Sequence, residues 1–314
     1  SYLANITFYT HVRGRLVNVL ETVQTAVAGL IVLAAALVAV RAGDLGMQTV
    51  GIMGILLGAG GYGLAIARET RTLRYPNFFY YSTFGLVFLL VGTGILLPIA
   101  WSSVIWALLA IMMAYFSSRA GWVSLSLQCT ILLVAASAAS GLLETGLESL
   151  VGNPANDWAV VTFPHVVVAL ATVVCLFIPV AQHSERWGKL AGLPQLIVLT
   201  LSVWSVGGLF IAVAAPDIAG VNGTEPSLAA LAALRTAMLS IAAVTLAISS
   251  RYPRWPEARW LVYPVLVLVG IKLFVEDFPN GEPTALFVAL GFVGTALLLV
   301  APLLKRPEEE PESA

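Results

Sequence analysis

The sequence predicts an all-α, polytopic integral membrane protein, and three observations support this fold class. Hydrophobic residues make up 59% of the 314 residues and charged residues only 11%, with a mean hydropathy of +0.91. Apolar runs of about 20 residues, the length that a helix needs to cross a bilayer, recur along the chain. The polar segments between these runs alternate in charge. Because this composition supplies too little polar surface for a soluble globule, we expect lipid to be the solvent.

Ten apolar segments approach or meet the length of a membrane span. Leu, Ala, Val and Gly fill them, without the strand-period alternation of a membrane β-barrel. A helix satisfies its backbone hydrogen bonds internally, which lipid requires. We therefore expect about ten transmembrane helices, near residues 17–40, 47–67, 78–98, 99–117, 121–142, 164–182, 194–214, 227–249, 259–275 and 283–304.

The polar segments form two alternating sets that predict the orientation of the chain. One set holds thirteen of the sixteen basic residues: Arg13, Arg15, Arg68, Arg71, Arg74, Arg119, Arg186, Lys189, Arg251, Arg254, Arg259, Lys305 and Arg306. The other holds a single basic residue, Arg41, and nine acidic ones: Asp44, Glu144, Glu148, Asp157, Asp217, Glu225, Glu276, Asp277 and Glu282. By the positive-inside rule, both termini are expected to face the cytoplasm, which an even number of spans allows.

The polar connections are too short to form a soluble domain. The longest, near residues 143–163, is expected to be a turn-rich loop around Gly152-Asn153-Pro154. We therefore expect residues 1–306 to form a single transmembrane domain. Residues 307–314 are acidic and contain proline, which is typical of a short disordered tail, here on the cytoplasmic side.

Glycines in the second predicted span favour helix packing. They form a smooth strip at helical spacing, which lets another helix approach closely: Gly51, Gly54, Gly58 and Gly61. Gly58, Gly60 and Gly63 also match a dinucleotide-binding spacing, but that motif needs a preceding strand and an aqueous site. The strip is expected to meet either another helix of the chain or a partner protein.

The cysteines and histidines do not form a recognisable cofactor site. Cys129 and Cys175 fall at a similar depth, so they can approach closely; small packing residues are the favoured interpretation, and a disulfide or metal pair is the alternative. His11, His165 and His183 lack zinc-site spacing and do not share a depth at which two of them hold a haem. We expect no metal, no cofactor and no catalytic residue.

Two ionisable residues inside predicted spans are the best functional candidates, Arg235 in the eighth and Lys272 in the ninth. Charge in a bilayer is costly, and such residues usually face the bundle interior and pair with a partner. Lys272 can reach Glu276 one helical turn on, and Asp277 lies beside it. The candidate partners for Arg235 are Glu276, Asp277, Glu144 and Glu148.

These residues permit two interpretations. In one, Arg235 and Lys272 form an outward-open pocket for an anion, and Pro264 and Gly270 kink the ninth helix below Lys272, as in broken transporter helices. In the other, which we favour, Lys272 extends to the outer interface and Arg235 pairs to lock neighbouring helices.

The same region resembles a known family. Three stretches carry the similarity: Leu234-Arg235-Thr236, Arg259-Trp260-Leu261-Val262, and Gly270-Ile271-Lys272-Leu273-Phe274-Val275-Glu276-Asp277, followed by the apolar helix 287–299. They are similar to the carboxy-terminal part of a large bacterial membrane-protein family, domain of unknown function 2339. The resemblance implies a protein of the bacterial inner membrane and no established activity.

Three functional classes remain. The first is a non-catalytic, structural or accessory subunit of a larger inner-membrane assembly, with the lipid bilayer and other membrane subunits or further copies of itself as partners. The second is a transporter or channel for a small solute, such as an anion, centred on Arg235 and Lys272. The third is an intramembrane enzyme on lipid-linked substrates, with His165, Glu144 and Asp157 as acid-base groups. A net charge of −1 argues against a nucleic-acid partner.

Overall fold

The computed structural model describes residues 46–69, 75–152, 158–178, 192–221, 226–280 and 282–305, with a few isolated positions between 24 and 43. Its described residues contain helices and no strand. Seven of the described helices are long and apolar enough to cross a membrane, or eight if one bent pair counts as a span. The all-α membrane fold class is confirmed at this level. Most of the predicted first span, 17–40, and the tail 307–314 lie outside the described residues.

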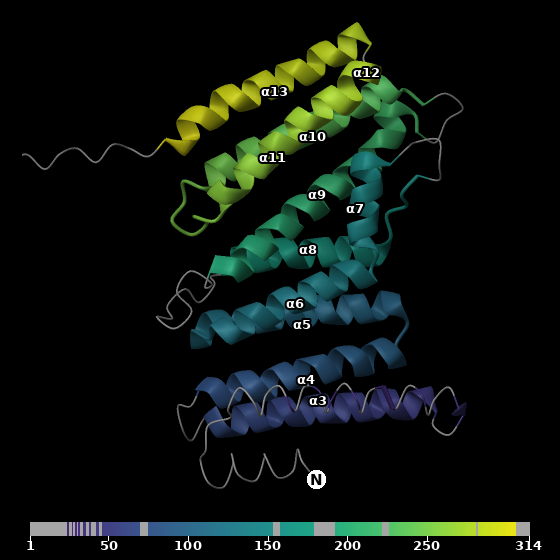
Figure 1. The fold of residues 1–314 in the computed structure, drawn as a ribbon, viewed down its shortest axis with the longest axis vertical. Helices are drawn as coiled ribbons and strands as arrows, with labels where there is room; N and C mark the ends of the chain where they lie inside the picture. The colour runs from purple at the N-terminus through teal and green to yellow at the C-terminus, as the bar shows by residue number, and fades with distance from the viewer. Residues whose placement is uncertain are drawn as a thin grey trace, which may run out of the picture. The chain divides into compact units, whose positions relative to one another are not determined.

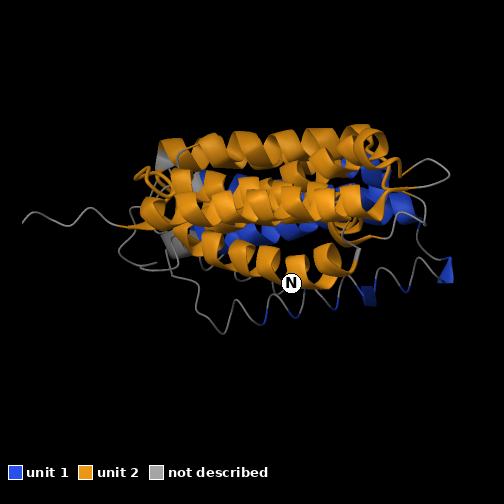
Figure 2. Ribbon diagram, turned by 90° about the horizontal axis from the view of Figure 1, so that it is seen from above, with its two compact units in different colours: residues 1–102 blue, residues 103–314 orange. Residues whose placement is uncertain are grey.

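The chain divides into two compact units, residues 1–102 and 103–314 (Figure 2). In the first unit, α3 (Met47–Glu69) and α4 (Tyr75–Leu96) pack along each other (Figure 1). Helix α5 (Ile99–Ala120) begins at the end of the first unit and lies mostly in the second. The expectation of a single transmembrane domain stays a prediction.

Helices α3 and α4 approach closely enough for their backbones to touch. A Cβ atom added at Gly54 would lie 2.9 Å from Cα of Gly92, and one added at Gly61 would lie 3.0 Å from Cα of Gly85. The first distance is shorter than real Cβ contacts, and the second is so short that the backbone of α4 would have to shift. The predicted packing strip therefore has its partner in the chain itself, on α4, which contributes glycines of its own.

The other glycines of α3 define the edges of this contact. Gly51 and Gly58 also face α4, where an added Cβ would meet the side chains of Leu96 and Leu89. Gly60 and Gly63 have nothing within 4 Å of an added Cβ. Packing therefore requires glycine only on the face of α3 that contacts α4.

The second unit is built around α10, which packs against α9, α11 and α13 (Figure 1). A buried apolar cluster joins these helices through Leu199, Leu246, Val262 and Val300. The elements that follow α5 are α6 (Val123–Ala139), α7 (Leu142–Val151), α8 (Phe163–Phe177), α9 (Leu193–Ala219), α10 (Leu228–Ser249), α11 (Ala258–Lys272), the π-helix η2 (Leu273–Asp277), α12 (Phe278–Asn280) and α13 (Pro283–Leu304).

The connection expected to be a loop near residues 143–163 was predicted wrongly, because it begins with helix α7. The chain turns by 65° between α6 and α7 at Gly141, whose φ of +81° favours glycine. The buried positions of α7 recur at helical spacing but are mainly small or polar: Leu142, Thr145, Gly146 and Ser149. Because α7 has only ten residues, a search for apolar segments of span length does not reveal it.

Helix α8 is shorter than the span expected at 164–182. It covers 15 residues and ends at Phe177, which is less than the roughly 20 residues that a full crossing needs. The remaining expected spans from 47 to 304 coincide with helices within a few residues, except that α9 continues through Pro216 to Ala219.

Candidate functional site

The four residues singled out from the sequence lie together at one end of α10, α11 and α7. Arg235 lies in α10, Lys272 is the last residue of α11, and Glu276 and Asp277 lie in η2. Three ion pairs connect them: Arg235 with Glu276 at 2.7 Å, and Lys272 with both Glu276 and Asp277 at 3.2 Å. We call these four residues the charge network.

Arg235 joins the charge network to α7. Its Nη1 donates to Oε1 of Glu276, while Nε donates to the carbonyl of Ser149 at 2.8 Å and Nη2 to that of Gly152 at 2.6 Å. The last carbonyls of a helix have no partner within the helix and form the negative end of its dipole. One buried guanidinium therefore closes the C-terminus of α7 and neutralises a carboxylate of η2.

Lys272 joins the charge network to α10. Its Nζ donates to the carbonyl of Ala232 and to Oγ1 of Thr236, both at 2.8 Å, and to Oδ2 of Asp277. The Thr236 hydroxyl in turn donates to Oδ2 of Asp277 at 2.7 Å. Because an ammonium group has only three N–H donors, these partners and Glu276 occupy it fully.

The π-helix explains how one lysine reaches two adjacent carboxylates. The N–H of Phe278 donates to the carbonyl of Leu273, five residues earlier. In an α-helix of 3.6 residues per turn, residue i+5 points about 140° away from residue i. The wider π turn brings i+5 back over i, so that Lys272 contacts both Glu276 at i+4 and Asp277 at i+5.

The charge network is electrically neutral and largely shielded from its surroundings. The side chains of Arg235, Lys272 and Asp277 are 4%, 9% and 3% exposed, and that of Glu276 is 23% exposed. Removing one member of a buried ion pair leaves an uncompensated charge, which is far more costly than replacing both. The arrangement is thus suited to fixing α7, α10 and η2 relative to one another.

Sequence reasoning missed two parts of this site. Thr236 directly follows Arg235 in an apolar span, and that adjacency was the available signal for its role between Lys272 and Asp277. The contribution of α7 is made by carbonyl groups, which any residue type carries. No sequence pattern identifies them.

The alternative partners and acid-base groups lie elsewhere. Glu144 and Glu148 are exposed on α7, and Glu148 approaches Arg235 only through its carbonyl, at 3.5 Å. His165 is buried at the start of α8, where its Nδ1 accepts the backbone N–H of Thr162 at 3.1 Å. This contact belongs to a capping box, a structural use of the histidine. Asp157, like His11 and His183, lies outside the described residues.

Cys129 and Cys175 approach each other, as their similar depth allowed. Their sulfur atoms are 3.8 Å apart, and both are buried free thiols of α6 and α8. Each thiol behaves as a small side chain in the contact between these helices.

No family model, no curated protein and no solved structure matches the chain. The similarity of residues 234–299 to the domain of unknown function 2339 family stays a prediction. The functional argument therefore rests on the geometry of the charge network.

Proposed function

We propose that the chain is a non-catalytic, structural or accessory subunit of a larger assembly in the bacterial inner membrane. The observation that carries this proposal is that both cations of the charge network are occupied by the chain's own groups. A transport site needs a charge that can exchange its partner for a solute. Here Arg235 and Lys272 bind two carboxylates together with carbonyls of α7 and α10.

The outer faces of η2 and α13 support an assembly role. Large apolar side chains such as Phe274, Phe287 and Leu298 are 71%, 79% and 77% exposed. Such surfaces suit contact with lipid or with the helices of a partner. The chain therefore has extensive area available for other subunits.

The mass of the intact particle tests the proposal. The protein would be extracted from its native membrane in mild detergent, and the mass and composition of the particle measured. We expect a mass well above the 33.2 kDa of one chain, with defined other subunits. A particle that contains only this chain would contradict the proposal.

The proposal includes ten spans with both termini in the cytoplasm. The charge alternation of the loops supports this, and it places the α10–α11 loop on the cytoplasmic side. A cysteine introduced as Arg254→Cys should react with a membrane-impermeant thiol reagent in inverted vesicles and not in spheroplasts. The opposite labelling would overturn the orientation.

A transporter for a small anion is the second candidate, and one observation favours it. The bent pair α6–α7 and the π-helix η2 meet at Arg235, and broken helices are typical of transporter binding sites. In this case an anion would displace Glu276 from Arg235. Loss of solute uptake in Arg235→Gln or Lys272→Gln vesicles with retained folding would support it, and unchanged uptake would exclude it.

A further inference from the structure

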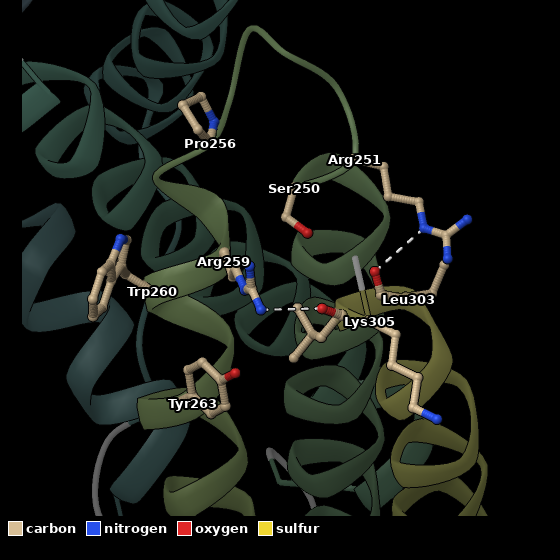
Figure 3. A pocket seen from close by; sticks show the side chains of 9 residues that line it. Ser250, Arg251, Pro256, Arg259, Trp260, Tyr263, Leu303 and Lys305 are labelled. Carbon is tan, nitrogen blue, oxygen red and sulfur yellow. Dashed lines mark hydrogen bonds between the residues drawn. The ribbon is translucent and has the colours of Figure 1, made fainter. Parts of the chain in front are cut away.

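A large cavity opens where the ends of three helices of the second unit converge, away from the charge network. Its volume is about 1030 Å³. Its lining includes Arg251 after the end of α10, Arg259 and Trp260 at the start of α11, and Lys305 after the end of α13 (Figure 3). Helix α10 packs against both α11 and α13, so the start of α11 and the end of α13 both lie beside the end of α10. The cavity thus lies at the same end of all three helices.

The cavity is positively charged. Three basic residues line it, and none of the described lining residues is acidic. Two of these cations are held in place by the end of α13: Arg251 donates to the carbonyls of Pro302 and Leu303, and Arg259 donates to that of Leu304 at 3.1 Å. Because each guanidinium has five N–H donors, these bonds position the group without exhausting it.

An apolar stripe leads from the cavity along α11. It begins with Trp260 and Tyr263, which line the cavity and are 75% and 51% exposed, and Figure 3 places both on the opposite side of Arg259 from Lys305. It continues through exposed Val267 and Ile271 of α11 to exposed Phe274 of η2. Trp and Tyr concentrate at the membrane-water interface, where an apolar ring meets a polar headgroup. This order would place the cations at headgroup depth and the stripe at the depth of acyl chains.

We propose that this cavity binds the headgroup of an anionic phospholipid whose acyl chains follow the stripe on α11. Guanidinium groups bind phosphate oxygens through paired hydrogen bonds, and basic pockets between membrane helices are suited to anionic headgroups. A free phosphate would use the cations but not the stripe. A soluble partner protein would not need an apolar surface that continues into the bilayer. The proposal is independent of the subunit role and of which leaflet the cavity faces.

Lipid titration followed by native mass spectrometry of the full chain tests this site. We expect phosphatidylglycerol to bind at least about tenfold more tightly than phosphatidylcholine with the same acyl chains. Glycerol phosphate and inorganic phosphate, which lack acyl chains, should neither bind comparably nor displace the lipid. Equal binding of the two lipids, or displacement by inorganic phosphate, would overturn the proposal.

Variants locate the lipid on the protein. Lys305→Gln should weaken phosphatidylglycerol binding about fivefold, since one basic residue near an anionic headgroup contributes about that factor. Trp260→Ala should weaken the binding of both lipids. The matched control is Arg254→Gln, which removes one positive charge from the α10–α11 loop, at the same end of these helices, but not from the cavity lining. Equal loss in Arg254→Gln and Lys305→Gln would mean that net charge, and not this cavity, selects the lipid.

Discussion

The helix contacts of the two units solve the same problem in opposite ways. Between α3 and α4, glycines let two backbones touch, and an added carbon atom at Gly54 or Gly61 would press against the backbone of α4. Between α7, α10 and η2, long charged side chains span the gap and complete one another's hydrogen bonds. Helices in lipid gain little from apolar burial alone, so close packing and interhelical hydrogen bonds are the forces available.

The comparison shows which kind of substitution should weaken each contact. The glycine contact depends on the absence of atoms, so it should fail when an atom is added. The charge network depends on every partner being present, so it should fail when one is removed. Deletions in the second unit and additions in the first are therefore the informative changes.

The largest effect is expected for Arg235→Met. This change keeps an apolar stem of similar length but leaves Glu276 without its shortest ion pair and the end of α7 without its cap. We expect a loss of about 3–5 kcal/mol in the free energy of unfolding, measured in mixed detergent micelles. Arg119→Met, at an exposed position near the end of α5, is the control. Equal stability of the two variants would show that the network does not hold the helices.

An addition should break the glycine contact with a smaller effect. Gly54→Ala should cost about 1–3 kcal/mol, because its Cβ meets the backbone of Gly92, which moves only if α3 and α4 separate. Gly60→Ala, on the open face of the same helix, should be neutral or stabilise by about 0.5–1 kcal/mol. If both variants unfold alike, close approach of the two backbones is not what holds this pair.

Thr236→Val sharpens the comparison by removing one hydrogen-bonding group from the charge network. It deletes the donor to Asp277 and one acceptor for Lys272 while keeping the side-chain shape. We expect a loss of about 1 kcal/mol in the same unfolding measurement, the usual scale of an interhelical hydrogen bond in a membrane protein. Thr245→Val is the control, because the exposed Thr245 hydroxyl bonds only within α10, to Ile241. A comparable loss in the control would remove the special role of Thr236.

Glu257, before α11, shows the opposite situation to Glu276. One of its carboxyl oxygens is buried, with no hydrogen-bond partner among the described residues, and burial raises the pKa of this carboxyl. The folded-state pKa lies above the unfolded value of about 4.3. The contribution of Glu257 to the free energy of unfolding is therefore most favourable below pH 4.3, and it falls as the pH rises through the folded-state pKa.

Replacing Glu257 should therefore remove a pH-dependent penalty. Glu257→Gln should raise stability at neutral pH relative to acidic pH, as measured by unfolding at a series of pH values. Glu144→Gln, at an exposed position of α7, is the matched control. An unchanged pH profile in Glu257→Gln would contradict this assignment.

Features that are marked by the type and spacing of residues could be predicted from the sequence. Charged residues inside apolar runs are conspicuous, so Arg235 and Lys272 could be identified, and the i+4 spacing indicated the pairing of Lys272 with Glu276. The glycine strip on α3 was equally visible because its members share a helical face.

The remaining parts depend on contacts that composition does not encode. The π-helix η2 arises from a shift of one hydrogen bond, from i+4 to i+5, and no residue type specifies it. Helix α7 is only ten residues long and carries Glu144 and Glu148, so it did not stand out as an apolar segment of span length. The partners of the Arg235 guanidinium on α7 are backbone carbonyls, which every residue carries.

The most direct test of the structural role of the charge network is a double-mutant cycle between Arg235 and Glu276. The unfolding free energies of the original chain, Arg235→Met, Glu276→Gln and the double variant give the coupling between the two side chains. If their 2.7 Å ion pair holds the helices together, the coupling should be at least about 1.5 kcal/mol. The double variant should then be more stable than the sum of the two single losses predicts. Single losses that add up to the loss in the double variant within about 0.5 kcal/mol would show that this ion pair does not hold the helices together.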